Sequence, residues 1–428
     1  MPEESKPQVI VAQLGARMHY AVPVLLHRAG MLAHFYTDAY VGKGSSWHWL
    51  TKVAPLIPRS WQPPALARLL NRQGNGLPAA KVTAFNLLGY QYVRALAHAA
   101  DDKARTDIHL QYGERFCQKV LQHNGGQGEA LYAFQGAALP LFHHAPARGW
   151  RCFFEQFSAP AAIMYPLYQG EHQRWPGWEA SDIEASVIPE VVEREHACWR
   201  VADRIICASE FVRQGLISQG MAPAKIQVVP YGVDINRYSG PKEAWNGKRP
   251  LRVLFVGGVT IRKGVQYLYE ALRILGHPLI ETRLVGPVSL SEMAKIKMGK
   301  VAELTGQVPR SEIAQHYQWA DLFVFPSICE GSATVCYEAL ASSLPVITTP
   351  NAGSVVRDGI DGFIVPIRNP EALAVKIDLL ARDPALLYQM SQNAQARARD
   401  FGWNIYGKRL VNALVSSINT DNKELLRG

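Results

Sequence analysis

Two glutamates lie on either side of an expected helix start in the stretch PSICEGSATVCYEALASSLPVITTP, residues 326–350. Glu330 belongs to a predicted loop with Gly331 and Ser332, and Glu338 belongs to the run ATVCYEALA, which predicts a helix. At the usual rise per residue, Glu338 lies about 9 Å further along the helix axis. Carboxylates placed in this way are not an acid and a base across one bond, as in a glycosidase.

The start of this helix predicts an anion site. Because the first amides of a helix have no partner within it, those of Ala333, Thr334 and Val335 should point at a bound anion. Glu330 can then accept hydrogen bonds from hydroxyl groups on one side of the anion, and Glu338 from hydroxyl groups on the other. Hydroxyls, diphosphate and hydroxyls, in that order, are the layout of a nucleotide sugar: hexose, diphosphate and ribose.

A second phosphate signal is the segment VGGVTIRKG, residues 256–264, which follows a strand candidate and opens a helix. Gly257 and Gly258 allow the backbone to approach a ligand closely. Arg262 and Lys263 arrive at the same place, and a helix N-terminus with two cations is suited to phosphate. The alternative is a solvated turn with two exposed cations.

Short apolar runs alternate with helical patterns along the chain. The strand candidates are residues 8–14, 33–40, 130–136, 151–157, 204–209, 226–232, 251–258, 281–287, 321–327, 344–349 and 362–366. Apolar strands joined by helices predict parallel sheets covered on both faces. The polar segment 236–250 predicts a linker between two doubly wound domains. Ligands of such sheets bind beyond the carboxyl ends of the strands, so the two domains should form a cleft.

The net charge of +9 is concentrated in one part of the chain. Residues 41–100 contain no Asp or Glu and hold Lys43, Lys52, Arg59, Arg68, Arg72, Lys81 and Arg94 together with Trp47, Trp49 and Trp61. This mixture suits a face that meets anionic lipid or an anionic acceptor. A solvated face with ordinary core aromatics is the alternative. No recognised motif for nucleic acid accompanies the charge.

Cysteine usage and the N-terminus indicate the compartment. Six scattered cysteines without a CxxC pair suit a reducing cytoplasm and small buried thiols. The N-terminus has no apolar signal region, and no apolar run approaches the ~18 residues of a membrane helix. We therefore expect a cytoplasmic protein that is peripheral at the inner face of the membrane if the basic block binds lipid.

Five ordered blocks lie in residues 200–410: VADRIICASEFVRQGL, KIQVVPYGVD, FVGGVTIRKGVQYL, the two-glutamate stretch continued to residue 366, and FGWNIYGKRL. Together they resemble the retaining GT-B glycosyltransferases of glycosyltransferase family 4. The resemblance implies an acceptor-binding Rossmann-like domain over 1–240 and a donor-binding one over 241–402. Residues 403–428 should form a helix that crosses back to the first domain.

The resemblance also implies roles for single residues. Glu330 would contact donor sugar hydroxyls near the reacting carbon, and Glu338 would bind the ribose diol. Lys263 would neutralise the diphosphate, and the backbone from 332 to 335 would contact sugar and phosphate. Gly15, in QLGARMHYAVP, matches the glycine-rich loop on the acceptor side.

Two positions depart from the family pattern. Gly258 stands where many members have an arginine, so we take Arg262 as the second cation. Many members also carry a histidine at the end of a strand near the donor sugar, where WRCFFEQFSAP offers Glu155 and Gln156 instead. His19 is another polar candidate on the acceptor side, although a lone histidine is more often structural.

The expected activity is transfer of a sugar from a nucleotide diphosphate to a glycan, glycolipid or other hydroxyl acceptor. The donor half has no DxD-like motif after a strand, so we expect no metal or cofactor, with protein cations meeting the leaving charge. The resemblance implies retention, with the leaving phosphate accepting the acceptor's proton. A GT-B sugar-nucleotide epimerase and a non-catalytic sugar-nucleotide-binding protein are the alternatives. The base, the sugar and the acceptor stay open.

Overall fold

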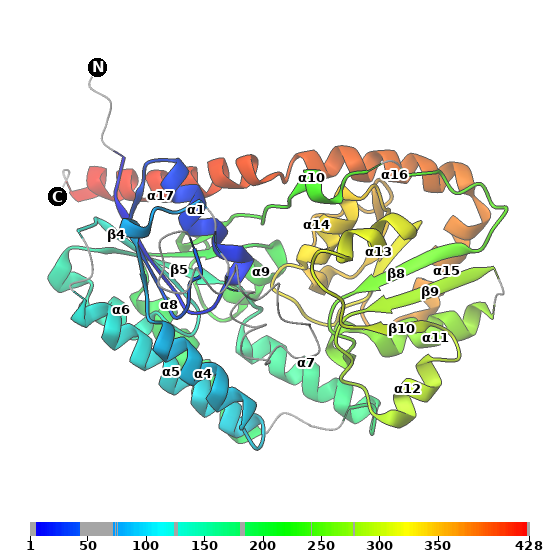
Figure 1. Ribbon diagram of the computed structural model, residues 1–428, viewed down its shortest axis with the longest axis horizontal. Helices are drawn as coiled ribbons and strands as arrows, with labels where there is room; N and C mark the ends of the chain where they lie inside the picture. The colour runs from blue at the N-terminus through cyan, green and yellow to red at the C-terminus, as the bar shows by residue number, and fades with distance from the viewer. Residues whose placement is uncertain are drawn as a thin grey trace, which may run out of the picture.

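Two separate parallel sheets make up the computed structural model of the chain (Figure 1). The structure describes residues 6–42, 72, 74, 76–123, 127–179, 185–240, 242–276 and 279–425. Figure 1 shows the first sheet on the left and the second on the right, with helix α7 below and between them.

The first sheet has seven parallel strands in the order β3-β2-β1-β4-β5-β6-β7. The strands are β1 Val9–Gln13, β2 Leu32–Thr37, β3 Val82–Ala84, β4 Ala130–Phe134, β5 Arg151–Gln156, β6 Arg204–Cys207 and β7 Ile226–Val228. Strands β1 and β4 are buried at every position, as expected for a sheet covered on both faces.

The second sheet has six parallel strands in the order β10-β9-β8-β11-β12-β13. They are β8 Leu251–Val256, β9 Ile280–Val285, β10 Glu303–Gly306, β11 Leu322–Phe325, β12 Val346–Thr348 and β13 Gly362–Ile364. The predicted fold class, two doubly wound parallel sheets, is confirmed. The sequence pattern missed β3 and β10, because both are short edge strands without a buried apolar run.

Helices connect the strands in both sheets. Around the first sheet lie α1 Ala21–Arg28, α4 Asn86–Ala97, α5 Asp102–Gln122, α6 Leu139–His144, α7 Ala161–Arg174, α8 Ile188–Val201 and α9 Glu210–Ser218. The linker helix α10 Ile235–Tyr238 packs on helices of the second sheet. Around the second lie α11 Val265–Leu275, α12 Glu292–Met298, α13 Ile313–Trp319, α14 Thr334–Ala341, α15 Pro370–Arg382 and α16 Pro384–Arg399. No helix in the described part of the chain is long and apolar enough to span a membrane.

The last helix, α17 Trp403–Leu425, runs from the second sheet back over the first (Figure 1). Its start packs on the segment after β7, where the Val233 amide donates to the Phe401 carbonyl at 2.8 Å. A Cβ on Gly232 would lie 2.7 Å from the Trp403 ring, so only glycine fits there. Further along, Gly407 lies against Leu25 of α1.

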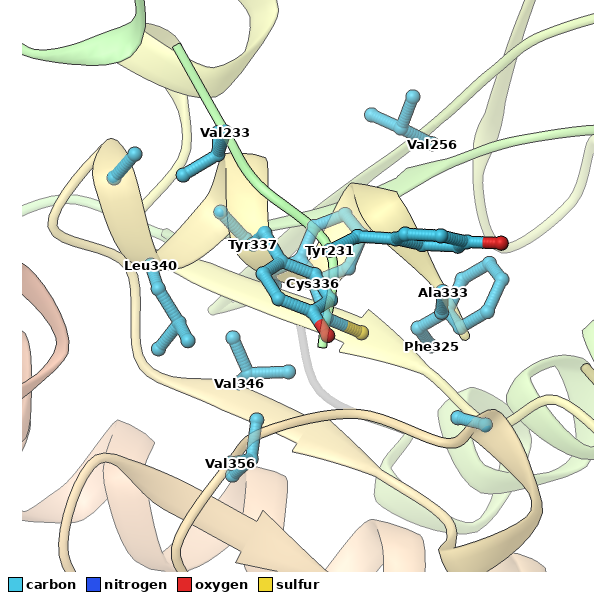
Figure 2. Close-up of a cluster of buried hydrophobic side chains, with 14 of the residues drawn as sticks. Tyr231, Val233, Val256, Phe325, Ala333, Cys336, Tyr337, Leu340, Val346 and Val356 are labelled. Atoms are coloured by element: carbon cyan, nitrogen blue, oxygen red, sulfur yellow. The ribbon is translucent and has the colours of Figure 1, made fainter. Parts of the chain in front are cut away.

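One hydrophobic cluster contains side chains from both halves of the sequence. Figure 2 shows Tyr231 and Val233, which follow β7, beside Ala333, Cys336 and Tyr337 at the start of α14. All six cysteines are free and buried, as the sequence predicts. The segment before α10 is therefore packed against the helix that carries Glu338.

Candidate active site

The two predicted donor-site loops meet at the carboxyl ends of the neighbouring strands β8 and β11. The Ile328 amide donates to the Arg262 carbonyl at 3.0 Å, and Arg262 Nη1 donates to the Cys329 carbonyl at 3.1 Å. The turn Ile261–Lys263, a short 3-10 helix, is thus bonded directly to the loop that carries Glu330.

Glycine is required where these loops approach each other. Gly264 has φ +75°, and a Cβ there would lie 1.9 Å from the Pro326 carbonyl oxygen. Gly257 has φ +144°, and a Cβ on Gly286 would lie 1.9 Å from the Gly257 oxygen. Gly258, by contrast, has room for a side chain, since a Cβ there would lie 3.8 Å from the Thr260 methyl, an ordinary contact distance.

Glu330 is paired with both predicted cations. Its Oε1 lies 3.2 Å from Arg262 Nη1 and also forms an ion pair with Lys263 Nζ. The Ser327 hydroxyl donates to the same oxygen at 3.3 Å. Burial lowers the pKa of Lys263, and the Glu330 carboxylate acts against this shift. The three side chains carry a formal charge of +1, which favours an incoming anion.

The first turn of α14 provides fewer free amides than the sequence predicts. The Ala333 amide donates to the Ala352 carbonyl at 3.0 Å, so the prediction that it points at an anion is wrong. The Ser332 hydroxyl donates to the Gly353 carbonyl at 3.0 Å and is buried. Thr334 and Val335 are the first two helical residues, whose amides have no partner within the helix.

Glu338 lies on α14 in a pocket of hydroxyl groups and arginines. Its Oε2 accepts a hydrogen bond from the Tyr317 hydroxyl at 2.8 Å. Burial raises the pKa of Glu338, while the hydroxyls of Tyr238 and Tyr317 and the positive charge of Arg310 act to lower it. Sequence patterns did not identify these neighbours, because they come from α10, α13 and the loop before α13.

On the acceptor side, Gly15 follows β1 with φ +90°. Its amide donates to Asp38 Oδ1 at 2.8 Å, and Gln13 Nε2 donates to its carbonyl at 2.8 Å. Asp38 is buried and pairs with Arg72 at 3.3 Å. The glycine-rich loop is therefore held by a buried carboxylate after β2.

The next residues form a left-handed turn. Met18, His19 and Tyr20 have φ of 44°, 53° and 62°, and the Tyr20 hydroxyl anchors the turn by donating to the Ala39 carbonyl at 2.6 Å. Partial desolvation and the positive charges of Arg310 and Arg237 lower the pKa of His19 to about 4. The same two arginines, which belong to the second half of the sequence or its linker, also act on the pKa of Glu338.

Arg17 is a candidate functional-site residue that the sequence motifs did not identify. Its guanidinium carbon lies 3.0 Å above the centroid of the Phe157 ring, at the end of β5. Arg17 starts the left-handed turn, and its charge also acts on the pKa of the nearby Glu155. A signal was present in the sequence: Arg17 lies two residues after Gly15.

Glu155 lies in the protein interior and not at the surface. The carboxylate is 2% exposed and accepts hydrogen bonds from Tyr132 at 2.6 Å and Tyr231 at 3.0 Å. Burial raises its pKa, and the two hydroxyls oppose that shift. Gln156 is also buried, where it accepts from Trp199 Nε1 and donates to Glu195.

Loops of the first and the second sheet touch at Gly331. A Cβ on this residue would lie 1.8 Å from the Phe157 carbonyl oxygen. The Ser209 hydroxyl, at the start of α9, donates to the Gly331 carbonyl. The residue next to Glu330 thus contacts two loops of the first sheet. Among the described residues, no group of three or more His, Cys, Asp or Glu side chains could hold a metal ion.

Solved structures share this architecture over nearly the whole chain. HepE of Anabaena, in complex with UDP and glucose, aligns with TM-score 0.62 at 16% identity over 96% of this chain and 100% of that one. Sucrose-phosphate synthase of Thermosynechococcus elongatus aligns with TM-score 0.65 at 16% identity over the same shares. At this identity the likeness concerns the fold, which is the GT-B fold of glycosyltransferases.

Family models identify the chain more closely. Glycosyltransferase Family 4 matches residues 149–237, and Glycosyl transferases group 1 matches residues 241–397. The chain belongs to the family 4-like glycosyltransferases. The D-inositol 3-phosphate glycosyltransferase of Kineococcus radiotolerans is 30% identical over 243 residues, which are 49% of this chain and 56% of that protein. The chain spans about half to three fifths of the length of the curated relatives it matches.

Proposed function

We propose that this protein transfers a sugar from a nucleotide-diphosphate sugar to a hydroxyl acceptor, with retention of configuration and without a metal. The observation that carries the proposal is the contact of Arg262 and Lys263 with Glu330, one loop before the helix that carries Glu338. The two cations and the free amides at the start of α14 suit a diphosphate, and Glu338, further along the same helix, suits the hydroxyl groups of a ribose. HepE, which has the same fold, has been solved with UDP-glucose.

The cations of the cluster supply the electrostatics of the reaction. As the bond between the anomeric carbon and the phosphate oxygen breaks, negative charge collects on the departing diphosphate. Arg262, Lys263 and the amides of Thr334 and Val335 meet that charge in a partly buried site, where such interactions are strong. The diphosphate competes with Glu330 for both cations, which frees the carboxylate to accept from sugar hydroxyls.

Retention follows from attack on the face that the phosphate leaves. The acceptor oxygen forms the new bond to the anomeric carbon, and its proton passes to the leaving phosphate oxygen. The products are a glycoside and a nucleoside diphosphate. Glu155 is poorly placed as a covalent nucleophile, since the hydroxyls of Tyr132 and Tyr231 enclose it in the interior.

An assay with acceptor and donor varied separately tests the proposal. The protein is incubated with UDP-glucose, UDP-N-acetylglucosamine or GDP-mannose and a panel of glycan and lipid-linked acceptors, with EDTA present. We expect release of nucleoside diphosphate that depends on acceptor, and a product with the donor's anomeric configuration by NMR coupling constants. Release only with added magnesium or manganese would contradict the metal-free proposal, and inverted product would contradict retention.

The same assay separates the two alternatives. A sugar-nucleotide epimerase would act on the donor without any acceptor, and a non-catalytic protein would bind the donor without turnover.

The variant Lys263→Met tests the role of Lys263 in the same assay. Lys300→Met is its matched control, because Lys300 is exposed on the loop after α12. Loss of turnover in both variants would remove the assigned role of Lys263.

Attachment to anionic lipid is a second part of the proposal, and it concerns the acceptor. Arg72 pairs with buried Asp38 and Lys81 donates to the Leu32 carbonyl, so these two cations have internal partners, whereas Arg94 is exposed. The other cations and the tryptophans of the basic block lie outside the described residues: Lys43, Lys52, Arg59, Arg68, Trp47, Trp49 and Trp61.

Vesicle sedimentation tests this attachment. Binding should require anionic lipid and fall with salt, because each surface cation contributes about 1 kcal/mol that salt screens. The variant to compare is the triple change Lys52→Ser, Arg59→Ser and Arg68→Ser, since Arg72 supports the Gly15 loop through Asp38. Wild-type protein that ignores anionic vesicles at low salt would assign the basic block to a soluble anionic acceptor.

A further inference from the structure

Residues 161–179, which belong to the first half of the chain, contact the donor half. We name this segment the α7 arm. Near its start, the Ala161 amide donates to Glu195 Oε2 of α8 at 2.6 Å, which ties it to the first sheet. The other end of the arm lies against the loop before α12, where the Ser291 amide donates to the Trp178 carbonyl at 2.8 Å. In the same place the backbones of Glu179 and Leu290 form an isolated antiparallel β-bridge. The arm therefore bridges the two halves, as Figure 1 shows for α7.

Glu171 makes the first polar contact of the arm with the donor half. It is fully buried, and its Oε2 accepts from Gln266 Nε2 at 2.8 Å and from the Tyr267 hydroxyl at 2.7 Å, both on α11. Arg368 Nε donates to its Oε1 at 2.5 Å. Three donors thus satisfy the Glu171 carboxylate, as a buried charge requires.

Glu179 makes the second contact, at the turn that carries the donor-site cations. Its Oε1 accepts from the Ile261 amide at 2.6 Å, and the Tyr168 hydroxyl donates to its Oε2 at 2.8 Å. Thr260 is the N-cap residue of the turn Ile261–Lys263, but its side chain makes no cap hydrogen bond. The cap that Thr260 would normally provide comes instead from a carboxylate in the other half of the sequence.

Both backbone polar groups of Ile261 are bonded to the arm or to a residue that the arm holds. The amide donates to Glu179, and the carbonyl accepts from Gln266 Nε2 at 2.9 Å, the same nitrogen that donates to Glu171. The Ile261 side chain is completely buried. Ile261 directly precedes Arg262 and Lys263, so the position of its backbone fixes the positions from which these two side chains extend.

We infer that Glu179 is a positioning residue for the donor diphosphate. It holds the turn through Ile261 so that Arg262 and Lys263 meet the phosphates, and the α7 arm links that turn to the acceptor half. This inference rests on the proposed function, since it assigns a diphosphate to the two cations. Glu179 itself acts through Ile261 and touches no reacting atom.

Calorimetric binding of nucleoside diphosphates and of the matching nucleosides tests the inference. Glu179→Ala should weaken diphosphate binding about tenfold, because a charge-assisted hydrogen bond is lost. Nucleoside binding should change less than about twofold, because the nucleoside lacks the group that the cations meet. Glu179→Gln should stay close to wild type, since the amide oxygen still accepts from Ile261 and the amide nitrogen can donate to Tyr168.

Ser291→Ala is the matched control. Its hydroxyl donates to the Gly177 carbonyl at 2.6 Å, so this variant loosens the arm without touching the turn. It should bind diphosphate like wild type. Unchanged diphosphate affinity in Glu179→Ala, equal losses for diphosphate and nucleoside, or a loss in Glu179→Gln as large as in Glu179→Ala would each overturn the inference.

Hydrogen exchange separates this inference from the proposed function. Without any ligand, residues 258–264 should exchange faster in Glu179→Ala than in wild type, because the Ile261 amide loses its acceptor. If wild type binds no nucleoside diphosphate, the proposed function fails and with it the diphosphate role. If the turn exchanges no faster in Glu179→Ala, the positioning role fails whatever the ligand.

Discussion

Replacing Gly331 by alanine perturbs a contact at which both halves meet beside Glu330. The added Cβ would lie 1.8 Å from the Phe157 carbonyl oxygen and 2.6 Å from its carbon, whereas real Cβ contacts are essentially never shorter than 3.0 Å. Both neighbours are backbone, so the two loops must separate by about an ångström or more. Misplacement of this size at a reacting centre costs about 100-fold in rate.

Steady-state kinetics and equilibrium binding check this prediction. Gly331→Ala should lower kcat about 100-fold while the nucleoside diphosphate still binds, because the cations and Glu338 stay within the second half. Gly299→Ala is the matched control: Gly299 has φ −62° at the end of α12, and its nearest atom to a new Cβ is 3.2 Å away. Wild-type turnover in Gly331→Ala would refute the close approach of the two loops at the site.

Three further predictions concern single side chains. Glu338→Gln should weaken nucleoside diphosphate binding about tenfold or more and weaken a 2′-deoxynucleotide less, because a ribose diol loses a charged acceptor; equal losses would remove the ribose role. Lys263→Met should lower kcat about 100-fold or more in the presence of EDTA, and a normal rate would refute its part in meeting the leaving charge. The pKa of His19 is about 4 in the folded protein and about 6.5 unfolded, so the unfolded chain binds more protons between these values and the free energy of unfolding falls as pH drops from 6.5 towards 4. Urea titrations should show a shallower fall in His19→Gln, and identical pH profiles would contradict a depressed pKa.

Much of the fold could be predicted because the order of polar and apolar residues along the chain indicates its strands and helices. Buried parallel strands need continuous apolar runs, and eleven such runs became strands of the two sheets. The meeting of Arg262, Lys263 and Glu330 also followed from topology, because the carboxyl ends of adjacent parallel strands share one sheet edge. The short edge strands β3 and β10 lack that apolar signal and were missed.

The surroundings of single polar groups could not be predicted, because their partners are distant in sequence. The Ala333 amide looked free from its place in the helix, yet a carbonyl 19 residues further on accepts from it. Glu155 was expected on the acceptor side, and the hydroxyls of Tyr132 in β4 and of Tyr231 after β7 hold it in the interior. Arg72 was counted as a surface charge, although it pairs with buried Asp38.

The α7 arm shows why a domain boundary drawn on the sequence differs from a functional one. Glu171 and Glu179 lie far before the linker, in a polar stretch that carries no motif, so nothing local assigns them to the donor half. Yet Glu179 caps the turn of Arg262 and Lys263, and Glu171 bonds the glutamine that holds the same turn. A donor-binding unit that begins at residue 241 would lack both carboxylates. The placement of Arg262 and Lys263 therefore depends on the two halves together, and a movement between the halves would reach these cations through the arm as well as through the loop of Gly331 and Glu330.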